Sequence, residues 1–307
     1  MIADTAVRAV GRIRDGSDKE RKAGMTTSTP ETGFSVKPVG GALGAAIDGI
    51  DLAVPLDPAV IAALRQALLK HMVLVFPGQG HITPEHHIAF ARYWGPLQEF
   101  PGGILVNDNK SLMAIVSPNE NNKDADDEAV RVTRTDIWHS DSSFQVNPPL
   151  GSILLARQIP DVGGDTMFSN QYLAYDALSK TMQSVLDPLH AVHTAEGVFK
   201  ASNRDPANAP RASHPIARPH PETGRKALYV NAVYTKQIEG MKKAESDSLL
   251  NYLYAHSSEP NFTYRHRWAQ GDLIIWDNRC TLHYAVHDYG NAPRVMHRAL
   301  AIDDSPG

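Results

Sequence analysis

Apolar positions recur along the chain with two different spacings, and together they predict a strand-rich domain with a few helices. The apolar run 72–76 is typical of a buried strand, the alternation along 294–302 predicts another strand, and a Gly-punctuated apolar stretch at 34–52 predicts short strands with a bend. Thr83 followed by Pro84 is a good N-cap and first-turn pair for a helix. Helical spacing and such start signals predict helices from residue 58, from 84 to about 94, at about 171–186 and at about 243–256.

Other segments complete the predicted organisation. Two extended runs joined by a turn within 263–277 predict a β-hairpin. The polar, acidic segment 117–136 has no periodicity, and a loop of that length inside a compact domain is a functional lid or is disordered. The N-terminal residues mix basic and acidic side chains without apolar periodicity. We therefore expect 1–32 to be a disordered leader and 33–307 to be one domain, mainly β with peripheral helices.

The composition narrows the classes of protein to which the chain can belong. It has 307 residues, a net charge of −4, one cysteine (Cys280) and 14 histidines. A single cysteine excludes an intrachain disulfide framework and a Cys-cluster metal site. The slightly acidic balance argues against nucleic-acid binding, and no apolar run approaches the roughly 20 residues of a membrane span. Because histidine is the commonest metal ligand, the 14 histidines allow a metal site without identifying one.

One histidine motif has the form of a metal site. His139 and Asp141 lie where the polar segment gives way to an extended one, and on a strand residues two apart face the same side. Two histidines and a carboxylate form a facial triad that leaves coordination positions open, which suits Fe(II) that must bind a co-substrate and O₂. A second histidine must then come from elsewhere. Since chance alone supplies about one His-x-Asp in such a composition, the motif does not identify the site by itself.

A second motif, His220-Pro221-Glu222, shares the His-x-carboxylate form but predicts a different structure. Pro221 and Gly224 bracket a tight reversal into the apolar run 227–230. We therefore interpret His220 as a turn residue rather than as a ligand.

Two arginines lie on an otherwise apolar face of the last predicted strand. Arg294 and Arg298 share that face with Met296, whereas His297 points to the opposite one. Buried charge is costly unless it is paired, and arginine pairs well with carboxylates, phosphates or sulfonates. The two arginines therefore bind anionic ligands, pair with carboxylates of the protein, or lie at the solvent-exposed end of the strand.

Four segments together carry a resemblance that no single motif provides. They are Trp138-His-Ser-Asp-Ser-Ser-Phe144, Gly163-Gly-Asp-Thr166, Trp276-Asp-Asn-Arg-Cys-Thr-Leu-His283 and Arg294-x-x-x-Arg298. In this order and spacing they resemble the TauD/TfdA family of Fe(II)- and 2-oxoglutarate-dependent dioxygenases, from about residue 36 to 302. The resemblance implies a double-stranded β-helix, that is, a jelly-roll core with helices outside.

The resemblance also implies roles for individual residues. The implied metal ligands are His139, Asp141 and His283. The implied partners of 2-oxoglutarate are Thr166 and Arg294, and Arg298 is the implied anchor of an anionic substrate. We expect His297 and Cys280 to be structural. Fe(II), 2-oxoglutarate and O₂ are the implied cofactors and co-substrates, and hydroxylation is the implied reaction.

The resemblance divides over the substrate. Parts of the chain are similar to enzymes acting on 2,4-dichlorophenoxyacetate and phenoxypropionates, and others to taurine and alkylsulfate dioxygenases. The segment 95–103 lacks the His and Tyr with which taurine dioxygenases contact their substrate, which argues against taurine itself. We expect an aryloxyalkanoate, with an alkylsulfonate or alkylsulfate as the alternative. We also expect a cytoplasmic homo-oligomer, a dimer or tetramer, that binds neither nucleic acid nor membranes.

Two functions of other classes compete with this interpretation. A zinc hydrolase could use the same two histidines and carboxylate, but it would not need Thr166 and Arg294. A non-catalytic jelly-roll binding protein would need no triad at all.

Overall fold

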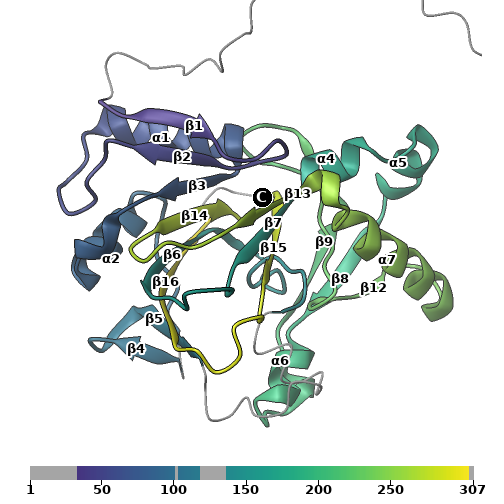
Figure 1. The fold of residues 1–307 in the computed structure, drawn as a ribbon. Helices are drawn as coiled ribbons and strands as arrows, with labels where there is room; N and C mark the ends of the chain where they lie inside the picture. Colours follow the sequence, from purple (N-terminus) through teal and green to yellow (C-terminus); the bar gives the residue numbers. More distant parts are fainter. Residues whose placement is uncertain (1–32, 101–102, 118–135, 304–307) are drawn as a thin grey trace, which may run out of the picture.

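The structure, a computed structural model, describes residues 33–100, 103–117 and 136–303. Its main feature is an eight-stranded sheet in the order β1-β2-β3-β14-β6-β16-β5-β4 (Figure 1). The strands of this sheet are β1 (Ser35–Pro38), β2 (Ala45–Asp48), β3 (Val73–Phe76), β4 (Ile104–Val106), β5 (Asn109–Ser117), β6 (Pro149–Gln158), β14 (Leu273–Asp277) and β16 (Arg294–Ile302). All but one of its strand pairings are antiparallel; β2 and β3 are parallel.

A smaller sheet packs against the large one and closes the jelly roll. Its order is β13-β7-β15, with bounds β7 (Thr166–Asn170), β13 (Thr263–His266) and β15 (Thr281–Ala285). Phe168 of β7 and Trp276 of β14 pack in one buried cluster, with ring centroids 5.4 Å apart. This apolar layer lies between the two sheets, next to the candidate site.

The central strand β14 shows how the sequence pattern builds two cores. Ile274 and Trp276 join the cluster between the sheets, whereas Leu273 and Ile275 join a second cluster on the outer face of the large sheet. Successive side chains of a strand point to opposite faces, so an unbroken apolar run is what a strand buried on both sides requires. The outer face is covered by two helices, α1 (Pro58–His71) and α2 (Pro84–Arg92) (Figure 1).

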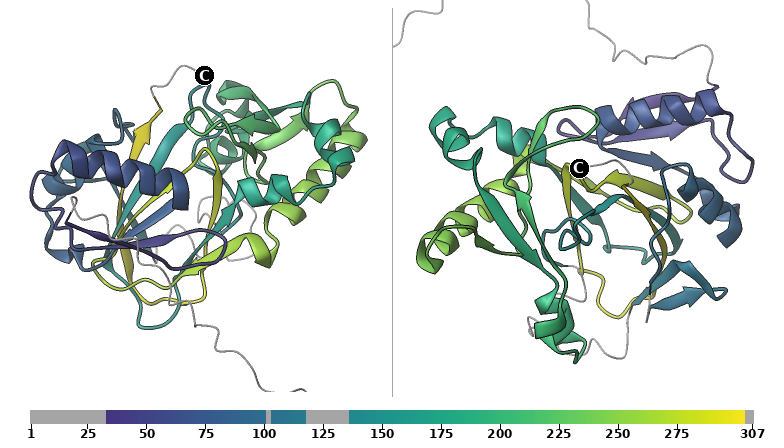
Figure 2. Two further views of the ribbon diagram at one scale, coloured as in Figure 1. Left: turned by 90° about the horizontal axis from the view of Figure 1, so that it is seen from above. Right: turned by 180° about the vertical axis from the view of Figure 1, so that it is seen from behind.

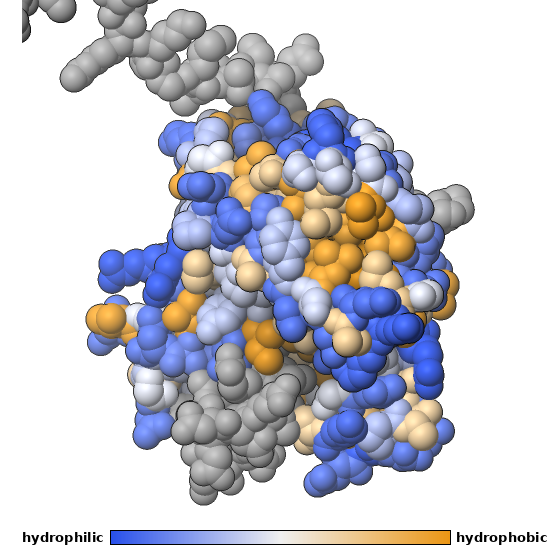
Figure 3. All heavy atoms as spheres, turned by 90° about the vertical axis from the view of Figure 1, so that its right-hand side faces the viewer, coloured by the Kyte–Doolittle hydropathy of each residue, from blue (hydrophilic) through white to orange (hydrophobic). Residues whose placement is uncertain are grey.

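A helical layer lies at the other end of the molecule from α1 and α2 (Figures 1 and 2). Its helices are α4 (Gln171–Asp176), α5 (Lys180–Leu186), α6 (Glu196–Ala201) and α7 (Lys243–Ser257). Its strands are β8 (His190–Thr194), β9 (Arg211–Pro215), β10 (Ala217–Pro219), β11 (Lys226–Leu228) and β12 (Thr235–Ile238). Short 3₁₀ turns lie at Pro206–Asn208 and Pro260–Phe262, and another, at Gln79–His81, lies between β3 and α2. Figure 3 shows this side as a mostly polar surface around an apolar patch.

Most predicted elements are confirmed, but two are wrong. Residues 263–277 do not form a hairpin, because β13 pairs with β7 in the small sheet while β14 pairs with β3 and β6 in the large one. The turn between them, in which Gly271 has a φ of +89°, carries the chain from one sheet to the other. The helix predicted at 171–186 is divided into α4 and α5, because the Ser179 hydroxyl accepts a hydrogen bond from the Met182 amide and starts a new helix.

The predicted fold class, a strand-rich jelly roll with outer helices, is confirmed. Residues 1–32 and most of the segment 117–136 lie outside the described residues, so the leader, the loop and the single-domain boundary at 33–307 stay predictions. Within the described ranges, no helix combines the length and the apolar character needed to cross a membrane.

Candidate active site

Two histidines far apart in sequence meet through their backbones. His139, before the large sheet's β6, and His283, in β15, form an isolated antiparallel bridge. Each amide donates to the other carbonyl, at 3.0 and 2.8 Å, and the two ring centroids are 4.1 Å apart. The second histidine that the sequence motif required is therefore His283.

Asp141 completes a group of three potential metal ligands. Its Oδ1 lies 3.8 Å from Nε2 of His139, and its Oδ2 lies 3.8 Å from Nε2 of His283. All three side chains are buried, and one ligand atom from each lies within 4.8 Å of the others. The segment is less regular than predicted, because the chain turns at Asp141 and Ser142 has a φ of +49°.

The protonation states of the three residues fit a divalent cation. Nδ1 of His139 lies 2.7 Å from the Ile137 carbonyl, which can only accept, so this nitrogen carries the proton and Nε2 keeps its lone pair. Burial lowers the pKa of His139 and lowers that of His283 to about 3. Burial would raise the pKa of Asp141, but the charge of Arg298 and the hydrogen bond from Ser152 act against it, and the pKa lies well below its ordinary value. Two neutral imidazoles and one carboxylate are a donor set suited to Fe(II).

Arg298 reaches the same centre from β16. Its Nη1 lies 3.3 Å from Oδ1 of Asp141, and its guanidinium carbon lies 5.7 Å from the centre of the Phe100 ring. Its Nε is buried without a hydrogen-bond partner among the described residues. Of the sequence alternatives for this arginine, pairing with a protein carboxylate is what the structure records, but a buried donor remains free for an anion.

Arg294 and Thr166 lie on strands next to the triad: Arg294 is in β16 with Arg298, and β7, which carries Thr166, pairs with β15, which carries His283. Nε of Arg294 donates to the Gly164 carbonyl at 3.2 Å, and no carboxylate in the described part of the chain forms an ion pair with this buried guanidinium. Gly164 permits the approach, because its φ is +72° and a Cβ there would meet the arginine at 3.3 Å. The Thr166 hydroxyl accepts a hydrogen bond from the Trp268 indole at 3.0 Å, so its own proton is free to donate. A buried cation and a free hydroxyl donor fit a carboxylate of a co-substrate.

Aromatic side chains that sequence reasoning did not assign lie near the triad. The Tyr234 ring lies 6.3 Å from that of His139 and 5.1 Å from that of Phe144. Burial raises the pKa of Tyr234, as does the charge of Asp141, while Arg298 lowers it, so the phenol is neutral and within electrostatic reach of both groups. Nothing in the sequence around Tyr234 distinguished it from a core aromatic.

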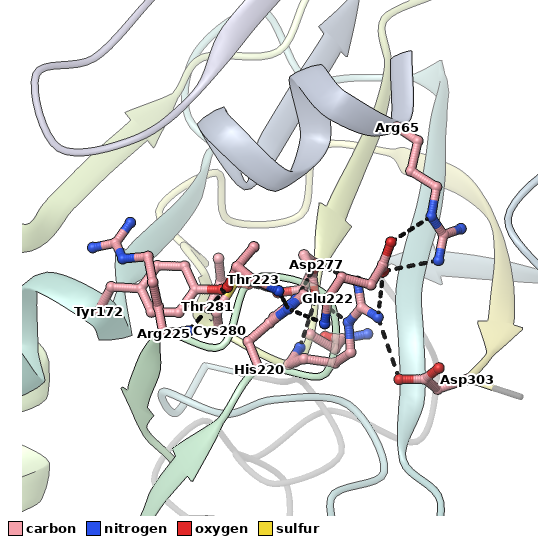
Figure 4. Close-up of polar contacts among 12 residues, drawn as sticks. Arg65, Tyr172, His220, Glu222, Thr223, Arg225, Asp277, Cys280, Thr281 and Asp303 are labelled. Atoms are coloured by element: carbon pink, nitrogen blue, oxygen red, sulfur yellow. Dashed lines mark hydrogen bonds and ion pairs between the residues drawn. The ribbon is translucent and has the colours of Figure 1, made fainter. Parts of the chain in front are cut away.

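A second cluster contains His220, Asp277 and Cys280, and it is not a metal site (Figure 4). Nδ1 of His220 accepts from the amides of Glu222 and Thr223, so Nε2 carries the proton and donates to Asp277 at 3.1 Å. Arg279 occupies both oxygens of Asp277, and burial raises the pKa of the Cys280 thiol well above its ordinary value.

With its lone pairs occupied, this cluster has no free ligand set, and the interpretation of His220 as a turn residue is supported. Its imidazole does more than expected, since it also fixes a buried carboxylate. The other histidine set aside, His297, faces away from the triad, where Nε of Arg157 donates to its Nδ1 at 3.3 Å.

Comparisons with known proteins agree with this site. The model of the taurine catabolism dioxygenase TauD, TfdA family matches residues 35–300. An alpha-ketoglutarate-dependent sulfate ester dioxygenase from Pseudomonas putida is 32% identical over 92% of this chain and 94% of its own. An alpha-ketoglutarate-dependent 2,4-dichlorophenoxyacetate dioxygenase from Cupriavidus pinatubonensis is 37% identical over 85% of this chain and 95% of its own.

Similarity to solved structures leads to the same class. A crystal structure of a taurine dioxygenase from Burkholderia xenovorans matches with a TM-score of 0.75 at 32% identity, over 89% of this chain and 91% of that one. A jelly roll that brings two histidines, a carboxylate and an arginine together thus has the architecture of a dioxygenase that uses 2-oxoglutarate (alpha-ketoglutarate). The chain belongs to the TauD/TfdA family. It is an enzyme of this class, with Fe(II), 2-oxoglutarate and O₂ as cofactors and co-substrates, so the zinc hydrolase and the non-catalytic binding protein are set aside.

Proposed function

We propose that His139, Asp141 and His283 bind the Fe(II) of this enzyme. The observation that supports this proposal is that two Nε2 lone pairs and an ionised carboxylate converge within 4.8 Å in a buried site. We assign the 2-oxoglutarate carboxylate to Arg294 and Thr166, and the anionic end of the primary substrate to Arg298.

In this assignment the protein residues bind, orient and exclude water. When bound, the metal with O₂ supplies the oxidising chemistry that converts 2-oxoglutarate to succinate and CO₂ and places one oxygen atom in a C–H bond of the substrate. Arg298 selects the carbon that is presented, because it holds the acid group at a fixed place beside the triad. The aromatic rings of the site, of which Phe100 is buried, limit the access of water to the reacting atoms.

We propose an aryloxyalkanoate, such as a phenoxyacetate or a phenoxypropionate, as the substrate. The Phe100 ring lies 5.7 Å from the guanidinium carbon of Arg298, and the Tyr234 ring lies 6.3 Å from that of His139 and 5.1 Å from that of Phe144. A carboxylate joined to an aromatic ring would place its charge on Arg298 and its ring against these side chains. Hydroxylation of the carbon that bears the ether oxygen gives a hemiacetal or hemiketal, which collapses to a phenol and a carbonyl compound.

An alkylsulfate or alkylsulfonate is the second candidate. Arginine binds a sulfate or sulfonate as well as a carboxylate, and relatives of 32% identity are named for sulfate esters. Hydroxylation of the carbon beside the ester oxygen of an alkylsulfate releases sulfate and an aldehyde, whereas hydroxylation of the carbon that bears the sulfur of an alkylsulfonate releases sulfite and an aldehyde.

A substrate screen coupled to succinate formation tests the proposal. We expect aryloxyacetates and aryloxypropionates to give more substrate-dependent succinate than taurine or alkylsulfates. Arg298→Gln should raise the KM for the preferred acid by roughly 10- to 100-fold, the value of a charge-assisted hydrogen bond. Arg225→Gln, a half-exposed arginine paired with Asp176, is the matched control and should leave the KM unchanged. Turnover confined to alkylsulfates or taurine would contradict the aryloxyalkanoate assignment.

We also propose that the enzyme is a cytoplasmic homo-oligomer. Light scattering of the purified protein and fractionation of expressing cells measure these two properties directly. A monomeric mass or a membrane-bound fraction would contradict them.

A further inference from the structure

The carboxylate of Asp141 is held by a serine from the neighbouring sheet. Ser152 lies in β6, where it is fully buried within an otherwise apolar run. Its Oγ lies 2.5 Å from Oδ2 of Asp141. A polar side chain in the middle of a buried strand is costly unless its hydrogen bonds are satisfied, so this contact accounts for a serine at a core position.

Ser152 is the third member of a chain of hydrogen bonds. The Trp276 indole Nε1 donates to Oδ1 of Asn278 at 3.0 Å, and Nδ2 of Asn278 donates to Oγ of Ser152 at 2.8 Å. An indole nitrogen can only donate, so it fixes the orientation of the Asn278 amide. Because the Ser152 hydroxyl accepts from that amide, its proton points to Asp141. The indole of Trp276 therefore determines the direction of each hydrogen bond in this series.

Asn278 also holds the backbone beside the carboxylate. The Ser140 hydroxyl donates to the Asn278 carbonyl at 2.6 Å, and the Asp141 amide lies 3.4 Å from Oδ1 of Asn278. The turn after β14 thus holds the Asp141 peptide and, through Ser152, its carboxylate. This places the tryptophan and asparagine of the Trp276-Asp-Asn-Arg segment in the support of the site.

We propose that Ser152 and Asn278 are positioning residues that orient the Asp141 carboxylate as a metal ligand. Ser152 donates to Oδ2, and Nη1 of Arg298 lies 3.3 Å from Oδ1, which faces His139, so both oxygens of the carboxylate are held beside the two imidazoles. The inference rests on the proposed function, in which Asp141 binds the metal. Residues that hydrogen-bond to a metal ligand hold it in its binding geometry, and their loss typically lowers metal affinity by about 10- to 100-fold.

Titration of the metal-free enzyme with Mn(II) alone, followed by the EPR signal of free Mn(II), tests the proposal without turnover. Ser152→Ala should weaken Mn(II) binding by roughly 10- to 100-fold. Ser169→Ala is the matched control, because this buried serine in β7 donates instead to the Ser257 carbonyl, and it should bind Mn(II) as the wild type does. Ser152→Thr keeps the hydroxyl and should restore most of the affinity.

Two further variants keep the test decisive. If Ser152→Ala is not recovered folded, Asn278→Ala removes the donor to Ser152 and should weaken Mn(II) binding in the same direction. Asp141→Asn separates the two proposals. If Asp141→Asn abolishes Mn(II) binding while the Ser152 and Asn278 variants bind as the wild type does, the positioning proposal is overturned and the triad stands. If Asp141→Asn binds Mn(II) normally, the ligand assignment itself is wrong.

Discussion

His139 and His220 begin two motifs of the same form, and their surroundings give them opposite roles. The Nδ1–H of His139 donates to the Ile137 carbonyl, which leaves Nε2 as a ligand. Nδ1 of His220 instead accepts from two backbone amides, so Nε2 carries the proton and is a donor. The turn residues around His220 were visible in the sequence, so this distinction could be predicted. The support of Asp141 by Ser152 could not, because the contact joins positions on two elements that only the fold brings together.

Buried neutral histidines make the stability of the enzyme depend on pH. His87 in α2 is fully buried, and burial lowers its pKa to about 3. The unfolded chain, with a histidine pKa of about 6.5, binds a proton below that pH which the folded state does not bind. The free energy of unfolding is therefore unaffected by His87 above about pH 6.5, and it decreases progressively as the pH falls from there toward 3.

The variant His87→Leu isolates this effect. In urea unfolding at a series of pH values below about 6, the unfolding free energy of the wild type should fall more steeply than that of His87→Leu, by up to about 1.4 kcal/mol per pH unit. Equal slopes for the two proteins would show that His87 does not remain neutral in the folded state.

At the scale of elements, local patterns predicted strands well and their pairing poorly. The apolar run of β14 and the alternation of β16 identify buried strands without any knowledge of partners. The run 263–266 is a strand too, but a short turn before the next strand does not determine whether the two pair. In a jelly roll the chain crosses between sheets at such turns, and this choice depends on the packing of Trp268 and its neighbours between the sheets.

A buried ion cluster joins elements that the sheets alone do not hold together (Figure 4). Arg279, after β14, pairs with Asp277, with Glu222 of the 220–225 turn and with Asp303 after β16. Its side chain is 2% exposed, and that of Asp277 is fully buried. The cluster therefore fastens the turn carrying His220 to the ends of two central strands.

Removing this guanidinium should destabilise the fold. Arg279→Met leaves the Asp277 carboxylate buried without its guanidinium partner, and we expect the free energy of unfolding in urea to fall by about 3–5 kcal/mol. Arg65→Met is the matched control, since Arg65 pairs with Glu222 at the more exposed edge of the same cluster and should cost less than about 1 kcal/mol. Similar losses for the two variants would contradict a dominant role for the buried pair.

At the scale of the whole molecule, the site is assembled from parts distant in sequence. The 139–141 segment, β15 and β16 each contribute a residue to the group formed by His139, Asp141, His283 and Arg298. The four motifs identified the class of enzyme because their order and spacing along the sequence reflect the topology of the fold. The substrate is less well determined by sequence, because Phe100, near Arg298, and Tyr234, near His139, come from segments outside the four motifs.

The most direct test of the account is the visible absorption of the enzyme with Fe(II) and 2-oxoglutarate in the absence of O₂. Chelation of Fe(II) by 2-oxoglutarate in this site should give a weak charge-transfer band in the wild type and in His220→Gln, which keeps a donor toward Asp277. The band should be lost in His139→Ala. Absence of the band from the folded wild type, or its persistence in His139→Ala, would contradict the assignment of the site.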